Sequence, residues 1–228
     1  MPSRREFLQR TTATTAALGA LGALAVPFPA LASVGLGPEP ALTSADWDVS
    51  WPARITGKHK AVYDVAEVES GYGVWRASAW AAQYADVFKI PAKDITPVIV
   101  LRHNAIILAM QQPFWDKYSI GTSKNVTHPL TGEPTDRNPV LLDETSGVPA
   151  PFNQAGLHRQ LSRGVVVLAC NLALQDCVEL IKQKGGLSDE AAHKEAVANL
   201  VPGVILQPSG VFAAVRAQEA GCAYVRSS

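Results

Sequence analysis

Short apolar runs alternate along this chain with segments in which apolar residues recur at helical spacing. Apolar runs that lack polar alternation are typical of strands buried on both faces of a parallel sheet. Strands are predicted at 60–65, 95–101, 165–168, 204–206 and 222–225, and helices at 74–88, 105–115, 154–162, 172–184, 188–200 and 209–220. Strands that alternate with helices predict an α/β protein, a three-layer α/β/α sandwich with a mainly parallel sheet of about five strands.

Two segments lack periodicity. Residues 33–58 are rich in Gly, Pro and polar residues and are predicted to form an irregular lead-in that packs Trp47 and Trp51 on the domain. Residues 119–153 form a proline-rich insertion in the single domain 59–228. So long an aperiodic stretch in a compact domain is usually an ordered functional loop, a lid or a disordered insertion.

The first 32 residues have the features of a twin-arginine export signal. Ser3–Leu8 (SRREFL) carries the arginine pair, a weakly apolar run covers 11–26, and 30–32 (ALA) forms a cleavage site. A retained amino-terminal membrane anchor is the alternative, but the small residues of this segment favour cleavage. We therefore expect the mature protein in the periplasm.

Charge and hydropathy narrow the classes of partner. Cleavage after Ala32 removes three arginines and one glutamate from the 20 basic and 20 acidic side chains, which leaves a formal charge of −2. Nucleic-acid-binding proteins usually carry a basic surface, so nucleic acid is not expected as a partner. No later segment is apolar and long enough to span a bilayer, so no membrane span is expected after cleavage.

The junction between the strand at 165–168 and the next helix holds the main candidate for chemistry, Cys170. This junction places a thiol where the carboxyl end of a strand meets the amino terminus of a helix. Functional groups of open α/β sheets collect at such strand ends, and a helix amino terminus stabilises a thiolate. The alternative is that Cys170 is a small buried apolar residue, as free cysteines often are.

The other two cysteines are expected in the core. Cys177 follows Cys170 by two helical turns, about 10.5 Å of rise, which is too far for a disulfide. Cys222 begins the last predicted strand and should lie at the opposite end of the sheet from Cys170. No intrachain disulfide is therefore predicted.

Further polar residues follow the predicted strands and should share the neighbourhood of Cys170. As candidate catalytic residue, His103 could deprotonate the thiol or orient a bound anion. As candidate ligand-binding residues, Arg102 could bind an anionic sulfur species or a carboxylate, with Asn104 and Asn171 beside it. Either His103 or Arg102 could instead cap the helix start or pair with an acidic neighbour.

No cofactor and no metal are predicted. The sequence has no Walker loop, no G-x-G-x-x-G, no haem-binding C-x-x-C-H and no serine nucleophile elbow. His128, Glu133 and Asp136 are potential ligands by residue type, but their spacing matches no metal site, and we interpret them as solvated loop residues.

Several segments resemble the DsrE/DsrF-like family: 165–172 (VVVLACNL), 208–211 (PSGV) and 217–225 (AQEAGCAYV), with 60–65 (KAVYDV) and 98–105 (VIVLRHNA) similar to its first two strands. The resemblance covers 60–226, apart from the insertion. It implies a doubly wound α/β fold and homo- or hetero-oligomers, often trimers or multiples of them. Some members carry sulfur as a persulfide on one cysteine in sulfur-transfer relays, and Cys170 matches that cysteine.

These observations lead to one main hypothesis. The chain is expected to be an exported DsrE/DsrF-like homo-oligomer that carries sulfur or relays redox equivalents through Cys170, with a sulfur-donor or sulfur-acceptor protein as its partner. The alternatives are a non-catalytic module of the same fold, which binds a small anion or a partner protein at the strand ends, and a purely structural subunit.

Overall fold

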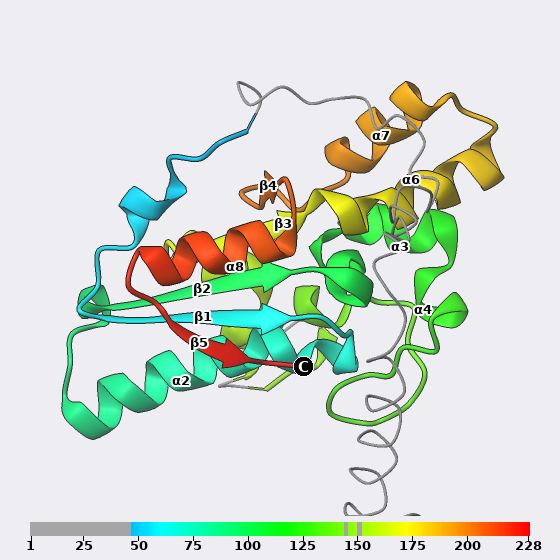
Figure 1. The fold of residues 1–228 in the computed structure, drawn as a ribbon. Coiled ribbons are helices and arrows are strands. Elements are labelled where there is room, and N and C mark those ends of the chain that lie inside the picture. The colour runs from blue at the N-terminus through cyan, green and yellow to red at the C-terminus, as the bar shows by residue number, and fades with distance from the viewer. Residues whose placement is uncertain (1–46, 144–145, 150–151) are drawn as a thin grey trace, which may run out of the picture. The chain divides into compact units, whose positions relative to one another are not determined.

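Five parallel strands form one sheet in this computed structural model, which describes residues 47–143, 146–149 and 152–228. The sheet order is β4-β3-β2-β1-β5 (Figure 1). The strands are β1 (His59–Val65), β2 (Ile95–Leu101), β3 (Val166–Cys170), β4 (Ile205–Gln207) and β5 (Ala223–Arg226). The predicted export signal at 1–32 and residues 33–46 of the lead-in lie outside the described residues.

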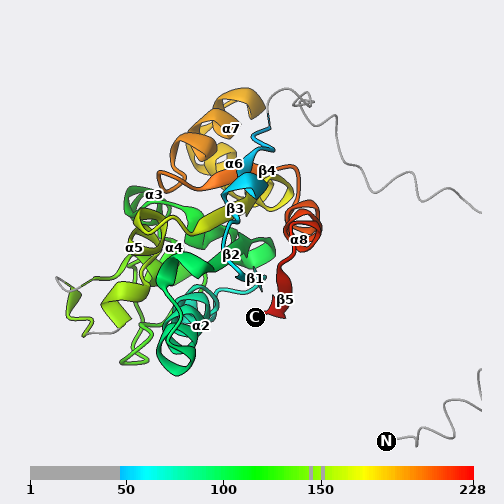
Figure 2. The same cartoon turned by 90° about the vertical axis from the view of Figure 1, so that its left-hand side faces the viewer.

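Helices cover both faces of the sheet, which confirms the predicted three-layer α/β/α sandwich (Figure 2). The α-helices are α2 (Tyr72–Phe88), α3 (Gln112–Tyr118), α4 (Ile120–Ser123), α5 (Leu157–Ser162), α6 (Asn171–Gly185), α7 (Asp189–Ala198) and α8 (Gly210–Glu219). Short 3-10 helices are η2 (Trp51–Arg54), η3 (Glu69–Gly71), η4 (Ala92–Asp94), η5 (His103–Ala109), η6 (Pro139–Leu141) and η8 (Phe152–Ala155).

The direction in which the chain crosses the sheet decides which face each helix covers. Strands β1 to β4 follow one another across the sheet in one direction, and right-handed crossovers then place their helices on a single face. After β4 the chain returns across the sheet to place β5 beside β1. The helix of this last crossover, α8, therefore lies on the opposite face (Figure 2).

Each face of the sheet has its own hydrophobic core. Ile99 and Val167 belong to the larger core, which includes residues of α2, α3, α6 and α7. Val100 and Leu168 belong to the smaller core, with α8 and Trp51. Successive strand residues point to opposite faces, so a strand covered on both sides has no polar alternation. This explains the continuous apolar runs of β2 and β3.

The helix predicted at 105–115 is divided into two shorter helical segments. In its place η5 ends at Ala109, the chain is extended at Met110, and α3 begins at Gln112. Pro113 has no backbone N–H with which to continue a helix from Ala109. Instead Met110 forms a β-bridge with Leu200, a partner that local periodicity does not reveal.

The described parts of the proline-rich insertion pack into the larger core. Ile120 and Val140 are almost fully buried. Asn138 is fully buried, and its side-chain amide donates to the carbonyl oxygens of Leu108, at 3.1 Å, and Met110, at 2.8 Å. Its side-chain oxygen accepts from the backbone N–H of Val140. Among the alternatives for this segment, the structure therefore favours an ordered part of the fold.

The end of the lead-in is anchored by Trp51. The Trp51 side chain is 1% exposed, and its indole N–H donates to the side-chain oxygen of Gln207 at 2.9 Å. Trp47 is only half-buried. The prediction that tryptophans pack on the domain is thus confirmed for Trp51.

Replacement of Asn138 by alanine should destabilise the protein. Asn138→Ala leaves two buried carbonyl oxygens and one N–H without their partners, so we expect a loss of about 3 kcal/mol in the free energy of unfolding. Urea denaturation measures this loss. Arg137→Ala, an exposed change next to it, is the control and should cost less than about 0.5 kcal/mol. Equal stability of the two variants would contradict the anchoring role.

Candidate functional site

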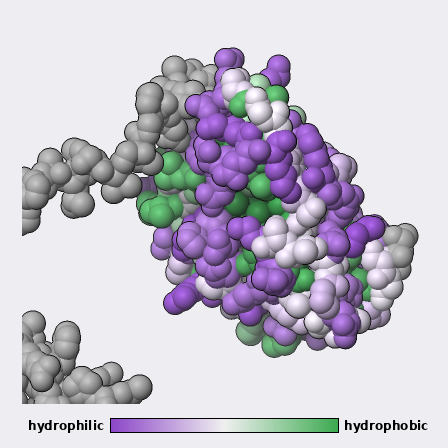
Figure 3. Space-filling model, turned by 90° about the vertical axis from the view of Figure 1, so that its right-hand side faces the viewer, coloured by the Kyte–Doolittle hydropathy of each residue, from purple (hydrophilic) through white to green (hydrophobic). Residues whose placement is uncertain are grey.

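The carboxyl edge of the sheet contains the topological feature that marks ligand sites in open α/β sheets. From β3 the chain enters α6 on one face, and from β4 it enters α8 on the other face. Adjacent strands with connections on opposite faces leave a crevice at their carboxyl ends. Cys170 and Gln207 are paired across β3 and β4 at this point. Figure 3 looks onto this edge, where hydrophilic residues surround hydrophobic ones near the middle.

Cys170 is both the last residue of β3 and the N-cap of α6. Its backbone is extended, with φ −81° and ψ 116°, and its Sγ accepts a hydrogen bond from the N–H of Ala173 at 3.4 Å. The thiol thus takes the place that Ser or Asp usually fills at a helix start. Cys170 is 6% exposed. The sequence prediction of a thiol at a strand–helix junction matches this placement.

Asn171 follows Cys170 in the chain, and His193 contacts Asn171. Asn171 is buried, and its Oδ1 is 3.1 Å from Nε2 of His193, on α7. An amide oxygen only accepts hydrogen bonds, so Nε2 of His193 is the donor. Sequence reasoning missed His193, because it lies within a helix and not at a strand end. We call these three residues the thiol group.

A second set of side chains joins the ends of three strands. Nε and Nη2 of Arg102 donate to the two carboxylate oxygens of Asp64 at 2.6 and 2.8 Å, and the hydroxyl of Tyr224 donates to Asp64 at 2.5 Å. We call these residues the ion-pair group. Burial raises the pKa of Asp64, but the hydrogen bonds from Arg102 and Tyr224 outweigh burial and hold the pKa below its usual value.

Close packing holds Arg102 in this position. A Cβ built on Gly210, the first residue of α8, would lie 2.5 Å from Cβ of Arg102, so only glycine fits there. The hydrogen bond to Asp64 is the main cause of a raised pKa for Arg102. The predicted anion-binding arginine therefore already has a carboxylate partner.

His103 and Asn104 form a third set with Glu67. Nδ1 of His103 is 3.2 Å from one oxygen of the Glu67 carboxylate, and the Asn104 amide donates to the other oxygen at 2.7 Å. The His103 side chain is 64% exposed and its backbone has φ +50°. Within the part of the chain that the structure describes, no hydrogen bond joins His103 to Cys170. The predicted residues thus reach the same edge but separate into three sets.

The other two thiols differ from Cys170 in their surroundings. Burial raises the pKa of Cys177 to about 12 and that of Cys222 to about 11. All three cysteines are free. A thiol with so high a pKa is almost never ionised at neutral pH, so Cys177 and Cys222 are poor candidates for thiolate chemistry.

Comparisons with known proteins do not assign the chain to a family. No protein-family model matches it, and neither does any curated protein. Within residues 47–143, 146–149 and 152–228, no helix is long and apolar enough to cross a membrane, and no cluster of three or more His, Cys, Asp or Glu side chains could hold a metal ion.

Loss of the Asp64–Arg102 pair should destabilise the protein in a pH-dependent way. Arg102→Met leaves Asp64 buried and charged, so we expect a loss of about 3 kcal/mol in the free energy of unfolding at neutral pH. Because the folded-state pKa of Asp64 lies below the ordinary value of 3.8, the contribution of the pair is complete above about pH 4. It is lost as the pH falls through the folded-state value. Urea denaturation from neutral to acidic pH measures this dependence.

The matched control is Arg216→Met, which breaks an exposed pair with Glu219 on α8. Exposed pairs contribute less than about 1 kcal/mol. A loss in Arg102→Met as small as that in the control would show that the ion-pair group does not hold the strand ends together.

Proposed function

We propose that this protein carries sulfur, or relays redox equivalents, through the thiol of Cys170. The observation that carries the proposal is the position of Sγ, which accepts a backbone N–H at the start of the 15-residue helix α6. The partial positive charge at a helix amino terminus favours the thiolate, which is the nucleophilic form of cysteine. In open α/β sheets, ligands bind at the carboxyl ends of adjacent strands whose connections lie on opposite faces, as those of β3 and β4 do.

The transfer step needs only the thiolate and a persulfide donor. The thiolate of Cys170 attacks the outer sulfur of the donor persulfide, and a new S–S bond forms on Cys170. The S–S bond of the donor breaks, and the donor leaves as a thiolate. Sulfur, protons and charge balance without any further oxidant. Transfer to an acceptor thiolate is the same reaction in reverse.

Asn171 and His193 have supporting roles in this proposal. The hydrogen bond between them orients the imidazole beside the residue that follows Cys170. A neutral imidazole can take up a proton from a thiol, and a protonated one can bind an anionic persulfide. We assign this role to His193 in preference to His103, because His103 faces solvent and contacts Glu67.

The alternative of a non-catalytic anion-binding module has less support. Its main cation would be Arg102, and the bidentate hydrogen bonds to Asp64 already satisfy much of that guanidinium. An anion at Arg102 would also meet the negative charge of Asp64.

The sequence features support a cellular location, a class of partner and an oligomeric state for this activity. The twin-arginine signal at 1–32 and the resemblance to the DsrE/DsrF-like family support a periplasmic protein whose donor or acceptor is another protein. The resemblance also supports a homo-oligomer, a trimer or a multiple of one. Val211 and Val215 lie one turn apart on α8 and are 67% and 47% exposed. We propose this apolar face of α8 as the contact between copies.

Cys170 should be the first cysteine that a thiol reagent modifies in the native protein. At pH 8 a thiol with a pKa of about 12 is ionised in about one molecule in 10,000, and one with a pKa of about 11 in about one in 1,000. Cys177 and Cys222 should therefore react slowly with iodoacetamide. Cys170, whose Sγ accepts a backbone N–H at the start of α6, should react at least about tenfold faster. Peptide mass spectrometry measures the three rates. A persulfide donor such as glutathione persulfide should add one sulfur atom to Cys170.

Two variants test the assignment. Cys170→Ser should lose both the fast labelling and the added sulfur, and Cys177→Ala should keep both. The proposal would be excluded if Cys170 were labelled as slowly as the other two cysteines. It would also be excluded if the Cys170→Ser variant gained as much sulfur as the unchanged protein.

Negative charges introduced on the exposed face of α8 should dissociate the proposed homo-oligomer. The double change Val211→Glu and Val215→Glu should lower the mass measured by light scattering to that of one chain, because it buries two carboxylates in the contact. Lys194→Glu, an exposed change on α7, alters the net charge by the same amount and should keep the oligomer. An oligomer that survives the double change would show that the contact lies elsewhere.

A further inference from the structure

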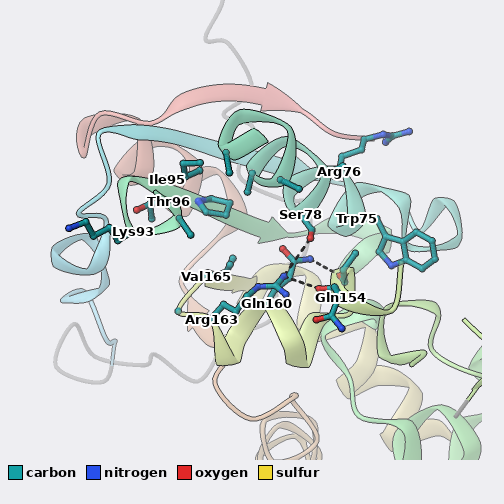
Figure 4. Close-up of a pocket in the computed structure, with 18 of the residues that line it drawn as sticks. Trp75, Arg76, Ser78, Lys93, Ile95, Thr96, Gln154, Gln160, Arg163 and Val165 are labelled. Carbon is teal, nitrogen blue, oxygen red and sulfur yellow. Dashed lines mark hydrogen bonds between the residues drawn. The ribbon is translucent and has the colours of Figure 1, made fainter. Parts of the chain in front are cut away.

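A pocket of about 790 Å³ opens at the amino-terminal edge of the sheet, the edge opposite Cys170. It lies between α2 and the η8–α5 segment, over the starts of β2 and β3 (Figure 4). This volume falls within the range of small-molecule sites. The pocket shares no residue with the thiol group, so its ligand is a question separate from the proposed sulfur chemistry.

Small residues on α2 keep the pocket open. The helix presents Ser78, Ala82 and Ala85 to the space, and none of these side chains is large enough to fill it. At one end Trp75 and Phe152 form an aromatic wall, with ring centroids 5.4 Å apart. An apolar ring in the pocket would therefore meet methyl groups along the helix and aromatic faces at the end.

A buried acceptor on the wall has no partner. Gln160 is fully buried, and its Nε2 donates to the carbonyl oxygens of Val74, at 3.0 Å, and Ala155, at 2.7 Å. These two acceptors fix the orientation of the amide, so Oε1 is the atom directed away from them. Among the described residues, Oε1 of Gln160 has no hydrogen-bond partner. A buried oxygen without a partner costs free energy that a ligand donor would recover.

A buried hydrogen-bond donor of the pocket wall also lacks a partner. Trp75 is 5% exposed, and its Nε1 likewise has no hydrogen-bond partner among the described residues. Trp75 comes from α2 and Gln160 from α5, so the two unpartnered atoms belong to different walls of one pocket.

The charges around the pocket have one sign. Its described lining residues include Arg54, Arg76, Lys93 and Arg163 but no Asp or Glu. Nη2 of Arg163 donates to the carbonyl oxygen of Gln154 at 2.8 Å and lies 3.5 Å from Oγ of Ser78. No described carboxylate lies within ion-pair distance of Arg163. Burial, with Arg159 nearby, lowers the pKa of Arg163, as expected for a guanidinium that loses water without gaining an anion.

We propose that this pocket binds a small aromatic or similarly apolar carboxylic acid that carries a hydroxyl or N–H group beside its carboxylate. The carboxylate pairs with Arg163, and the hydroxyl or N–H group donates to Oε1 of Gln160. The apolar body lies along the alanines of α2 toward Trp75. Arg163 and Gln160 are three residues apart on and just after α5, so one small ligand reaches both. Figure 4 shows the side chains of Ser78, Gln160 and Arg163 directed toward one another.

Three compounds that differ by one group test the ligand chemistry. They are 3-phenyllactate, 3-phenylpropionate, which lacks the hydroxyl, and 3-phenylpropionamide, which lacks the charge. Isothermal titration calorimetry with the full chain should show affinities in that order, with a Kd for phenyllactate below about 1 mM. Each step should weaken binding about tenfold, because the first removes a hydrogen bond to the buried Gln160 and the second removes an ion pair with Arg163.

Variants tie the binding to this pocket. Arg163→Gln should abolish the preference for the acid over the amide and leave the affinity for the amide unchanged. Ala82→Phe should fill part of the pocket and weaken the binding of all three compounds about tenfold. Arg216→Gln, on α8 at the other face of the sheet, is the control and should change nothing. Thermal denaturation of each variant shows whether it is folded.

Three results would overturn the proposal. They are equal affinity of the wild-type chain for the acid and the amide, an acid preference that survives in folded Arg163→Gln, and no binding of any compound at 1 mM.

Discussion

The reversal of chain direction after β4 is the constraint on which the rest of the structure depends. While the chain moves from β1 to β4, right-handed crossovers collect the helices on one face. The return to β5 forces α8 to the other face, where it covers the sheet together with Trp51. The same reversal separates the connections that leave β3 and β4. The position of Cys170 at a topological switch point is thus a consequence of strand order, which any sequence with this topology would share.

The sheet and the position of Cys170 could be read from the sequence because local patterns determine them. The unbroken apolar run of β3 and the switch to helical spacing after Cys170 are both short-range signals. The side-chain pairs at the carboxyl edge of the sheet could not be predicted from local patterns. Asp64 and Arg102 could pair with several neighbours, and the choice depends on how Gly210 lets α8 approach. His193 meets Asn171 only because α7 folds back onto α6, which no residue of either helix signals alone.

Charged side chains at the two edges of the sheet have different kinds of partner. At the carboxyl edge, the Arg102 cation is balanced by Asp64 within the chain, and His103 contacts Glu67. At the amino-terminal edge, Arg163 contacts only neutral oxygens among the described residues. Arg163 is exposed and forms no ion pair with a described carboxylate, so an anion can pair with it without displacing a carboxylate of this chain.

Helix α6 shows how strongly position decides the chemistry of a thiol. Cys170 and Cys177 belong to one helix region and are both buried, at 6% and 2% exposure. Cys177 lies in the middle of the helix, where every nearby backbone N–H already bonds to a carbonyl, and burial raises its pKa to about 12. Cys170 lies at the start, where the first N–H groups have no carbonyl partner within the helix, and Sγ accepts one of them. Burial of Cys170 therefore excludes water without removing its hydrogen-bond donor.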